Sequence, residues 1–403
     1  MIVNNSIRVG VGVLSALLTI AVFGRAEDVP RTFADVKQEH ERAYEAIMKR
    51  RELAKTDAEQ EAVTAEAWAR IKVDTNRALA WADAHPDDPA AIDAIVWTVH
   101  GLSNGYSAEC AVERARAFTL LKEKGLASEK IVPVCYYSTV GAFVCPEEMQ
   151  FLQAALTKSP SRLVRAAACL GLARTNHTIV TLALRSRDPI TRKPLEQRWK
   201  GTDLVSRLYG VDPEELNRRA EAYFVRITDE FGDLKMPYPY NPTPFAEMAR
   251  GELFELRGLG VGNLLPELEG EDVRGQKLPW SDYRGKVVAV VFWATWCGPC
   301  MGMVPHEREL VKRMAGKPFV LLGVNGDDDR VKAAETMTKE KMSWPSLWNG
   351  SKMGGFVDKL GVRSWPTIYV IDAQGVIRYK NVRGESLDQA VDLLVKEAET
   401  GRK

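Results

Sequence analysis

The sequence predicts two structural classes in one chain, an all-α region over residues 27–235 and an α/β domain over residues 258–403. Residues 27–235 are rich in Ala, Leu, Glu, Lys and Arg, and their apolar residues recur at the spacings of three and four that are typical of helices. Residues 287–291 instead form an unbroken apolar, mostly β-branched run that predicts a buried strand, and helical spacing returns over residues 301–314.

The composition limits the class of protein. The chain has 403 residues, which is too long for one small domain and indicates two or three. Its hydrophobic content of 45% and charged content of 27% are ordinary for soluble globular proteins. A net charge of +1 gives no reason to expect a nucleic acid or an anionic surface as a partner.

The N-terminal segment differs from the rest of the chain. Arg8 precedes an uncharged apolar run at residues 9–23, and the small residues Gly24 and Ala26 follow it. This pattern predicts a signal peptide over residues 1–26, cleaved before Glu27. The run is short for a membrane-spanning helix, but an uncleaved anchor at residues 9–23 is the alternative. Both interpretations predict an extracytoplasmic protein, periplasmic or secreted.

The all-α region consists of helices separated by turn-forming residues. Such breaks occur at residues 85–89, between helices expected at 79–84 and 90–99, and at residues 159–161. At a third break, Asp212 is expected to cap a helix in which Pro213 takes the first position. The highly charged residues 39–72 predict one long, solvated helix, which could form a hairpin with its neighbour. The paired helices are similar to tetratricopeptide-type repeats, which would offer a concave surface for a partner; a plain helical domain is the alternative.

A connection is expected between the two regions at residues 236–257. Four prolines lie between Met236 and Pro244, which predicts a stiff linker. A short helix is expected at residues 245–256, before Gly258 opens the second domain.

Two cysteines stand where the buried strand ends and the next helix begins. Backbone N–H groups in the first turn of a helix would stabilise a thiolate at Cys297 and make it a nucleophile. Cys300 lies one turn later and can close a disulfide with it, while Pro299 suits an early helical position. A zinc site or a fixed structural disulfide is the alternative, but no second CxxC accompanies the pair.

Residues 258–400 resemble the thioredoxin fold, and specifically the TlpA-like extracytoplasmic thiol–disulfide oxidoreductases. The resemblance rests on residues 281–286, on the WCGPC motif at 296–300, on Pro305 and on residues 364–367. It implies that Pro305 kinks the active-site helix and that Pro366 is cis and faces the cysteines. It also implies that Trp296 and Trp365 flank the reactive sulfur, where Trp365 would shape the groove that docks the substrate. Simple packing is the alternative for both tryptophans.

The remaining elements of the second domain follow from local patterns. Strands are expected at residues 318–324 and 368–371, an edge segment at 343–348, a helical turn at 356–360 and a closing helix at 387–398. Asp372 and Gly375 predict a hairpin after the second of these strands. The three acids at residues 327–329 resemble a metal loop, but capping of a helix that runs to Lys341 explains them more simply.

The chain departs from the related families at two positions. Cytoplasmic thioredoxins carry a buried Asp where this sequence has Val291, and TlpA-like proteins often carry a Glu where it has Met303. Both acids are thought to help move the proton of the second thiol. The base that deprotonates Cys300 is therefore water or an acid that the fold brings in.

Four further cysteines lie in the all-α region. Cys135 and Cys145 flank a turn at Gly141 and are the favoured disulfide pair among the three possible pairings, which also involve Cys110. Cys169 lies in an apolar helix and is expected to be a small core residue.

No metal site is expected. The five histidines are His40, His85, His100, His177 and His306, and no two have the spacing of metal ligands on one element. His306 is expected to be an exposed helical residue, although it lies near enough to the cysteines to tune them.

The predicted function is reduction of disulfides in partner proteins by the Cys297–Cys300 dithiol, without a cofactor. The Gly-Pro pair between the cysteines is typical of reducing thioredoxins. An upstream thiol donor must then restore the dithiol. One alternative is a partner-binding helical protein with a tethered redox module. Another is a thiol peroxidase, disfavoured by the residues around Cys297. The sequence has no CxxCH motif for c-type haem.

Overall fold

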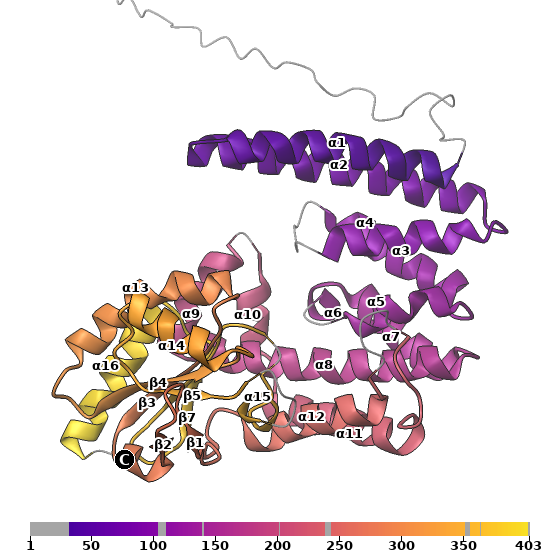
Figure 1. Ribbon diagram of the computed structural model, residues 1–403. Coiled ribbons are helices and arrows are strands. Elements are labelled where there is room, and N and C mark those ends of the chain that lie inside the picture. Colours follow the sequence, from indigo (N-terminus) through magenta and orange to yellow (C-terminus); the bar gives the residue numbers. More distant parts are fainter. Residues whose placement is uncertain are drawn as a thin grey trace, which may run out of the picture. The chain divides into compact units, whose positions relative to one another are not determined.

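The computed structural model describes residues 32–103, 110–138, 141–200, 202–237, 243–350, 355–362 and 364–401. The chain divides into two compact units, with the division after Ala94. The expected signal peptide at residues 1–26, with the alternative anchor at 9–23, lies outside the described residues. No helix within the described ranges is both long enough and apolar enough to cross a membrane. The expected fold class is confirmed: helices come first and an α/β thioredoxin fold follows (Figure 1).

The first unit contains a hairpin of two long helices, α1 (Phe33–Leu53) and α2 (Asp57–Ala84). Each helix begins with a capping box. The side chain of the N-cap threonine, Thr32 or Thr56, accepts a hydrogen bond from the backbone N–H of the third helical residue. The carboxylate of that third residue in turn accepts the backbone N–H of the threonine. The single long helix expected over residues 39–72 is wrong, because α1 ends at Leu53 and α2 begins at Asp57, and the hairpin lies within this stretch. The reason is local: the Thr56–Glu59 box starts a new helix inside that stretch.

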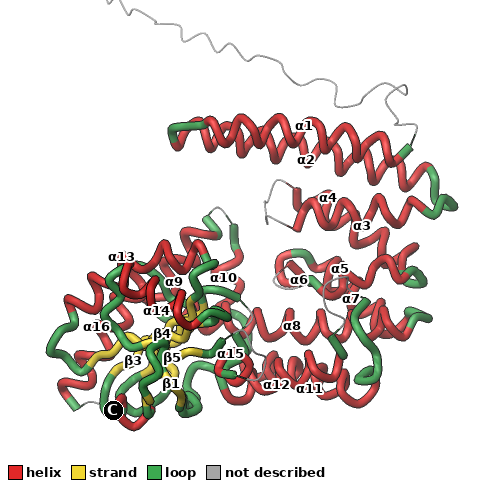
Figure 2. The backbone as a smooth tube through the Cα atoms, in the orientation of Figure 1, coloured by secondary structure: helices red, strands yellow, loops and turns green. Residues whose placement is uncertain are grey.

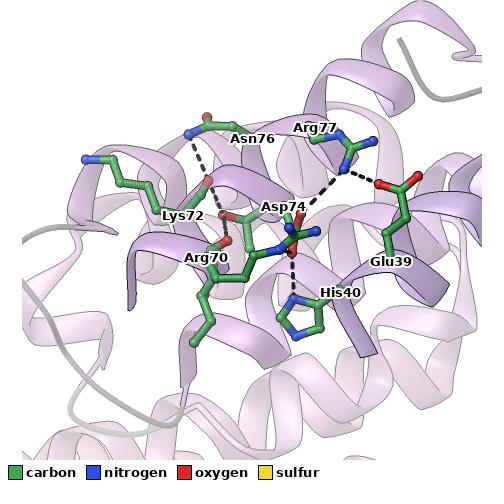
Figure 3. Close-up of polar contacts among 9 residues, drawn as sticks. Glu39, His40, Arg70, Lys72, Asp74, Asn76 and Arg77 are labelled. Carbon is green, nitrogen blue, oxygen red and sulfur yellow. Dashed lines mark hydrogen bonds and ion pairs between the residues drawn. The ribbon is translucent and has the colours of Figure 1, made fainter. Parts of the chain in front are cut away.

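Polar side chains connect the two helices of this hairpin (Figure 3). The Asp74 carboxylate is fully buried and accepts hydrogen bonds from Nδ1 of His40 at 2.9 Å and from Nε of Arg70 at 2.5 Å. Burial alone would raise the pKa of Asp74, but the bonds from His40 and Arg70 outweigh burial and lower it. Arg77 donates to Glu39 at 2.7 Å nearby. Residue 40 pairs with residue 74 and the earlier residue 39 pairs with the later residue 77, as antiparallel helices require.

The helices α3 to α12 follow, and α3 spans the division between the units. Their bounds are α3 Ala90–Ser103, α4 Ala111–Leu120, α5 Val132–Tyr136, α6 Gly141–Val144, α7 Pro146–Lys158, α8 Arg162–Arg187, α9 Pro189–Arg198, α10 Leu204–Tyr209, α11 Pro213–Glu230 and α12 Phe245–Gly258. A π-helical turn, Leu121–Gly125, continues α4, and the 3₁₀ turn Glu129–Ile131 precedes α5. The buried helix α8 packs against α5, α7 and α11. Asp212 caps α11 with Pro213 in its first turn, as expected.

The stiff linker stays a prediction, because residues 238–242 of the proline-rich segment after α11 lie outside the described residues. The described residues at its two ends are hydrogen-bonded to each other: Met236 N–H donates to the Thr243 carbonyl at 3.2 Å, and Phe245 N–H to that of Leu234 at 3.0 Å. Prolines suit such a turn as well as an extended spacer. The segment therefore returns the chain to α12, which packs beside α11. The short helix expected at residues 245–256 is confirmed as α12.

The thioredoxin fold is built on a five-stranded mixed sheet with the order β5-β4-β3-β6-β7. The strands are β3 Val287–Trp293, β4 Phe319–Asn325, β5 Ser346–Trp348, β6 Thr367–Ile371 and β7 Ile377–Lys380. β3 is parallel to β4 and antiparallel to β6. The pair β1 (Gly270–Glu271) and β2 (Lys277–Leu278) forms a separate two-stranded sheet. Figure 2 shows the strands, in yellow, gathered together.

Both faces of the sheet are covered, which explains why β3 is apolar at every position. The face formed by alternate residues from Val287 to Trp293 packs on α13 (Gly298–Arg313), α14 (Arg330–Lys339) and α16 (Glu385–Thr400). The opposite face, with Val288, Val290 and Phe292, packs on residues 259–268, on the 3₁₀ turn Trp280–Tyr283 and on α15 (Phe356–Lys359). The edge position of β5 and the hairpin between β6 and β7 agree with the local signals.

Candidate active site

The site is formed where β3 ends and α13 begins. Cys297 is the N-cap residue of α13, and its Sγ accepts the N–H of Cys300 at 3.2 Å. Pro299 lies in the first turn, where no N–H is needed. The positive end of the helix dipole and this backbone donor both favour negative charge on the Cys297 sulfur. The strand-to-helix junction predicted for the cysteines is thus observed.

Cys297 and Cys300 are joined by a disulfide, with an S–S distance of 1.95 Å and a Cα–Cα distance of 5.3 Å. Both residues are nearly buried, at 4% and 3% exposure. The structure therefore holds the pair in its oxidised form. Within the described residues, no group of three His, Cys, Asp or Glu side chains could hold a metal ion.

Two tryptophans lie beside the disulfide. Trp296 is 62% exposed, and its ring lies edge-on to that of Trp365, with the ring centres 5.5 Å apart. The Trp365–Pro366 peptide bond is cis, as the family resemblance implies. Gly326 explains how Trp365 fits, because a Cβ at position 326 would lie 2.4 Å from its indole ring. The three predicted docking residues, Trp296, Trp365 and Pro366, are thus found on two neighbouring loops.

Asp327 supports the loop that presents Cys297, which the sequence did not predict. Its buried carboxylate accepts the backbone N–H of Thr295 at 2.9 Å, the Thr295 hydroxyl at 2.7 Å and Nδ2 of Asn325 at 2.7 Å. Of the acids at 327–329, only Asp329 caps α14. The capping explanation is therefore right for Asp329 and wrong for Asp327. An acid two residues after β4, the strand beside the active-site strand β3, was the signal available.

His306 is half-buried and belongs to the contact between α13 and α16. Its Nε2 lies 2.9 Å from Oδ2 of Asp388, which also pairs with Arg313 at 2.9 Å. This partner on α16 replaces the solvent-exposed position that we expect from sequence. Pro305 lies inside α13, where the resemblance puts it.

Glu307 is the other residue that the sequence reasoning missed. It lies on α13 and is 3% exposed. Burial raises the pKa of its carboxyl to about 7. The helical spacing of Cys300, Val304 and Glu307 was a signal for its position, because residues four and three apart share one face of a helix.

The favoured disulfide between Cys135 and Cys145 is wrong, because both are buried free cysteines. They belong to different helices: Cys135 lies within α5, whereas Cys145 caps α7 and its thiol donates to Glu147 at 3.4 Å. Cys169 is a core residue of α8, as expected, and its thiol donates to the Tyr223 carbonyl at 3.5 Å.

Comparisons with known proteins concern the C-terminal fold. Residues 261–380 match the AhpC/TSA family. The thiol:disulfide interchange protein DsbE of Vibrio cholerae is 32% identical over 131 residues, which cover 32% of this chain and 68% of DsbE. The thiol-disulfide oxidoreductase ResA of Bacillus anthracis is 26% identical over 133 residues, 33% of this chain and 75% of ResA.

A solved structure is similar as well. The thioredoxin domain of a thiol-disulfide oxidoreductase from Bacteroides vulgatus has 24% sequence identity and a TM-score of 0.33, covering 34% of this chain and 99% of that one. Given the DsbE match and the family match, this chain belongs to the thioredoxin-like thiol-disulfide oxidoreductases of the AhpC/TSA family.

Proposed function

We propose that the protein reduces disulfide bonds in partner proteins outside the cytoplasm, through the dithiol form of Cys297 and Cys300. The observation that carries the proposal is the Cys297–Cys300 disulfide at the N-terminus of α13, beside the exposed Trp296. A pair held one turn apart in this way can open and close without moving the helix. Such a pair passes two electrons by thiol–disulfide exchange.

The reaction has two steps. Reduced Cys297 attacks one sulfur of the substrate disulfide and forms a mixed disulfide, releasing the other substrate sulfur as a thiolate. The Cys300 thiolate then attacks Cys297, which restores the Cys297–Cys300 bond and releases the second substrate sulfur as a thiolate, so the substrate leaves reduced by two electrons. An upstream thiol donor reduces the pair again. The Gly-Pro dipeptide between the cysteines favours this reducing direction.

Trp296, Trp365 and Pro366 form the docking surface for the substrate in this proposal. The exposed indole of Trp296 and the half-buried indole of Trp365 offer apolar contacts to a peptide that lies over the disulfide. Pro299 and Pro305 have structural roles in α13. The residue before a cis proline also offers backbone groups to an extended peptide, which suits a protein substrate.

Three finer assignments belong to the same proposal. They are the TlpA-like subtype, a tetratricopeptide-like character of residues 27–235, and export directed by residues 1–26. We also retain residue 258 as the start of the redox domain. Sequencing the N-terminus of the protein recovered from the periplasm tests the export claim, since cleavage is expected before Glu27.

An insulin disulfide reduction assay tests the activity. The native protein is expected to reduce insulin and the Cys297→Ser variant to lose this activity, because serine cannot form the mixed disulfide. The Cys300→Ser variant is expected to trap the mixed disulfide, which a non-reducing gel resolves as a larger species. Cys169→Ser is the matched control. Equal activity of the native protein and Cys297→Ser would refute the proposal.

A further inference from the structure

The buried face of α13 carries an ionisable group that the two-step reaction above does not use. Glu307 is 3% exposed, and its Oε1 is shielded from solvent without a hydrogen-bond partner among the described residues. A polar group buried without a partner is destabilising. This position therefore calls for a functional explanation.

Cys300 and Glu307 share this buried face. Residues 300, 304 and 307 are separated by four and three positions, so they follow one another along one side of the helix. Seven residues correspond to about 10 Å between the two Cα atoms. Side chains on a helix tilt toward its N-terminus, so the four-atom Glu307 side chain leans from its own Cα back toward Cys300.

The neighbourhood of this face is otherwise apolar. The facing elements contribute the following residues to the core: Val287, Ala289, Val291 and Trp293 from β3, Ala333 and Met337 from α14, Tyr379 from β7, and Leu387, Ala390, Val391, Leu394 and Val395 from α16. The titratable groups in this core are Cys297, Cys300 and Tyr379. His306 and Arg313, at the margin of α13, are paired with Asp388 of α16. Burial, without a compensating charge, raises the pKa of the Glu307 carboxyl to about 7.

Resting on the proposed function, we propose that Glu307 is a positioning residue for the proton of Cys300, with the carboxyl and the thiol holding one negative charge between them. Two charges several ångströms apart in a protein interior interact strongly enough to shift a pKa by about one unit. Ionised Glu307 therefore keeps the Cys300 thiol protonated, and ionisation of Cys300 favours the neutral carboxyl. Such a pair titrates as a unit.

The coupling between Glu307 and Cys300 provides an acceptor for the proton that Cys300 loses in the second step. The Cys300 thiol gives its proton to the Glu307 carboxylate, and the resulting thiolate attacks Cys297 Sγ. The Cys297–Cys300 bond forms, and the bond from Cys297 to the substrate sulfur breaks. The substrate leaves as a thiolate, so the enzyme loses the two electrons that the substrate gains. When the thiol donor reduces the pair again, Glu307 returns the proton to Cys300.

The test uses the full-length protein with Glu307→Gln, and Glu309→Gln on the exposed side of α13 as the matched control. A reduced-minus-oxidised infrared difference spectrum is expected to contain a carboxylic acid band in the native protein and in Glu309→Gln, and to lack it in Glu307→Gln. Isotope-labelled cysteine reports the Cys300 titration by NMR. Its pKa is expected to fall by about one unit in Glu307→Gln, because a neutral amide no longer opposes the thiolate.

A native spectrum without the carboxyl band overturns the proposal, and so does a Cys300 titration that is the same in Glu307→Gln. If Glu307→Gln does not fold, the native and Glu309→Gln spectra still decide, because the band is measured without the variant. The two measurements report the Glu307 carboxyl and the Cys300 thiol directly, and neither needs a protein substrate. They remain informative if the native protein fails to reduce insulin, an outcome that would refute the proposed function alone.

Discussion

The cysteines of the redox fold and those of the helical region are equally buried but differ in chemistry. Cys297 is 4% exposed and Cys145 is 6% exposed. Both are N-cap residues, Cys297 of α13 and Cys145 of α7, but the Cys297 sulfur accepts a backbone N–H, whereas the Cys145 thiol donates a hydrogen bond to the carboxylate of Glu147. Burial raises the pKa of Cys145 to about 11 and that of Cys169 to about 12, and it also raises that of Cys135. Neither exposure nor a position at a helix N-terminus therefore distinguishes these two thiols; the hydrogen-bond partner of the sulfur does, because a backbone N–H favours the thiolate and a carboxylate favours the thiol.

The burial of the free cysteines in the helical region also bears on the proposed extracytoplasmic location. Free thiols are at risk of oxidation outside the cytoplasm. Cys135 and Cys169 are fully buried, and their raised pKa values keep the thiolate, the form that oxidises, scarce. In the proposed oxidising compartment, the helical region can thus keep its cysteines reduced, while the cysteines of the redox fold undergo thiol–disulfide exchange.

The largest expected effect is in alkylation rates. In the reduced protein at pH 7, iodoacetamide is expected to label Cys297 about a thousandfold faster than Cys145 or Cys169, because only thiolates react and a pKa of 11 to 12 leaves very little thiolate. Raising the pH from 7 to 9 is expected to speed labelling of Cys169 about a hundredfold, because its thiolate fraction grows about tenfold with each pH unit as long as the pH is below its pKa. Peptide mass spectrometry measures each site.

Unfolding supplies the control for this prediction. In denaturant the six cysteines are expected to label at similar rates, since the fold no longer separates their environments. Equal labelling of Cys297 and Cys169 in the native reduced protein would contradict the difference in thiol reactivity between the redox fold and the helical region.

A smaller effect is expected from the support beneath Cys297. Asp327→Ala leaves the Thr295 N–H, the Thr295 hydroxyl and the Asn325 amide without their acceptor, which is expected to destabilise the protein by about 2–3 kcal/mol. The loop that sets the angle of Cys297 is expected to loosen as well, so alkylation at Cys297 should slow several-fold. Denaturant titration and labelling kinetics measure the two effects.

The neighbouring acid gives the matched control. Asp329→Ala removes only the cap of α14, where Asp329 accepts the N–H groups of Val331 and Lys332, at an expected cost of about 1 kcal/mol. Labelling of Cys297 is expected to stay at the native rate. If both variants slow labelling equally, the support assigned to Asp327 is wrong.

Local signals predicted much of this fold. The apolar run of β3, the helical spacing of α13 and the Asp372–Gly375 turn each depend on a few adjacent residues, and each is observed. The same holds for the dithiol, because the strand-to-helix junction carries both cysteines. The family resemblance contributed the cis peptide bond before Pro366, which local patterns alone leave open.

The misses depend on contacts between distant residues. Asp327 meets Thr295 only because β4 lies beside β3, and sequence reasoning assigned it to the nearest helix. Cys135 and Cys145 are close in sequence but belong to helices with separate packing. Helical spacing places Glu307 on the buried face of α13, but a charged residue there contradicts the apolar pattern of that face, so composition alone favours an exposed position. Polar residues in unexpected places were therefore the least predictable part of the site.

The smallest expected effect on the redox chemistry lies in the α1–α2 hairpin. Asp74→Asn removes the charge that accepts bonds from His40 and Arg70, which is expected to destabilise the hairpin by about 2–3 kcal/mol near pH 7 (Figure 3). Alkylation of Cys297 is expected to be unchanged. Glu61→Gln, at an exposed position of α2, is the control and should alter neither property.

The pH dependence sharpens this last prediction. The pKa of Asp74 is lowered in the folded protein, so its stabilising contribution is present above the ordinary value for the unfolded chain. It is lost as the pH falls through the lowered pKa, because the protonated carboxyl no longer carries charge. The stability difference between the native protein and Asp74→Asn should therefore shrink below about pH 4. If this stability difference stays constant down to pH 2, Asp74 stabilises the hairpin through packing and hydrogen bonds rather than through its charge.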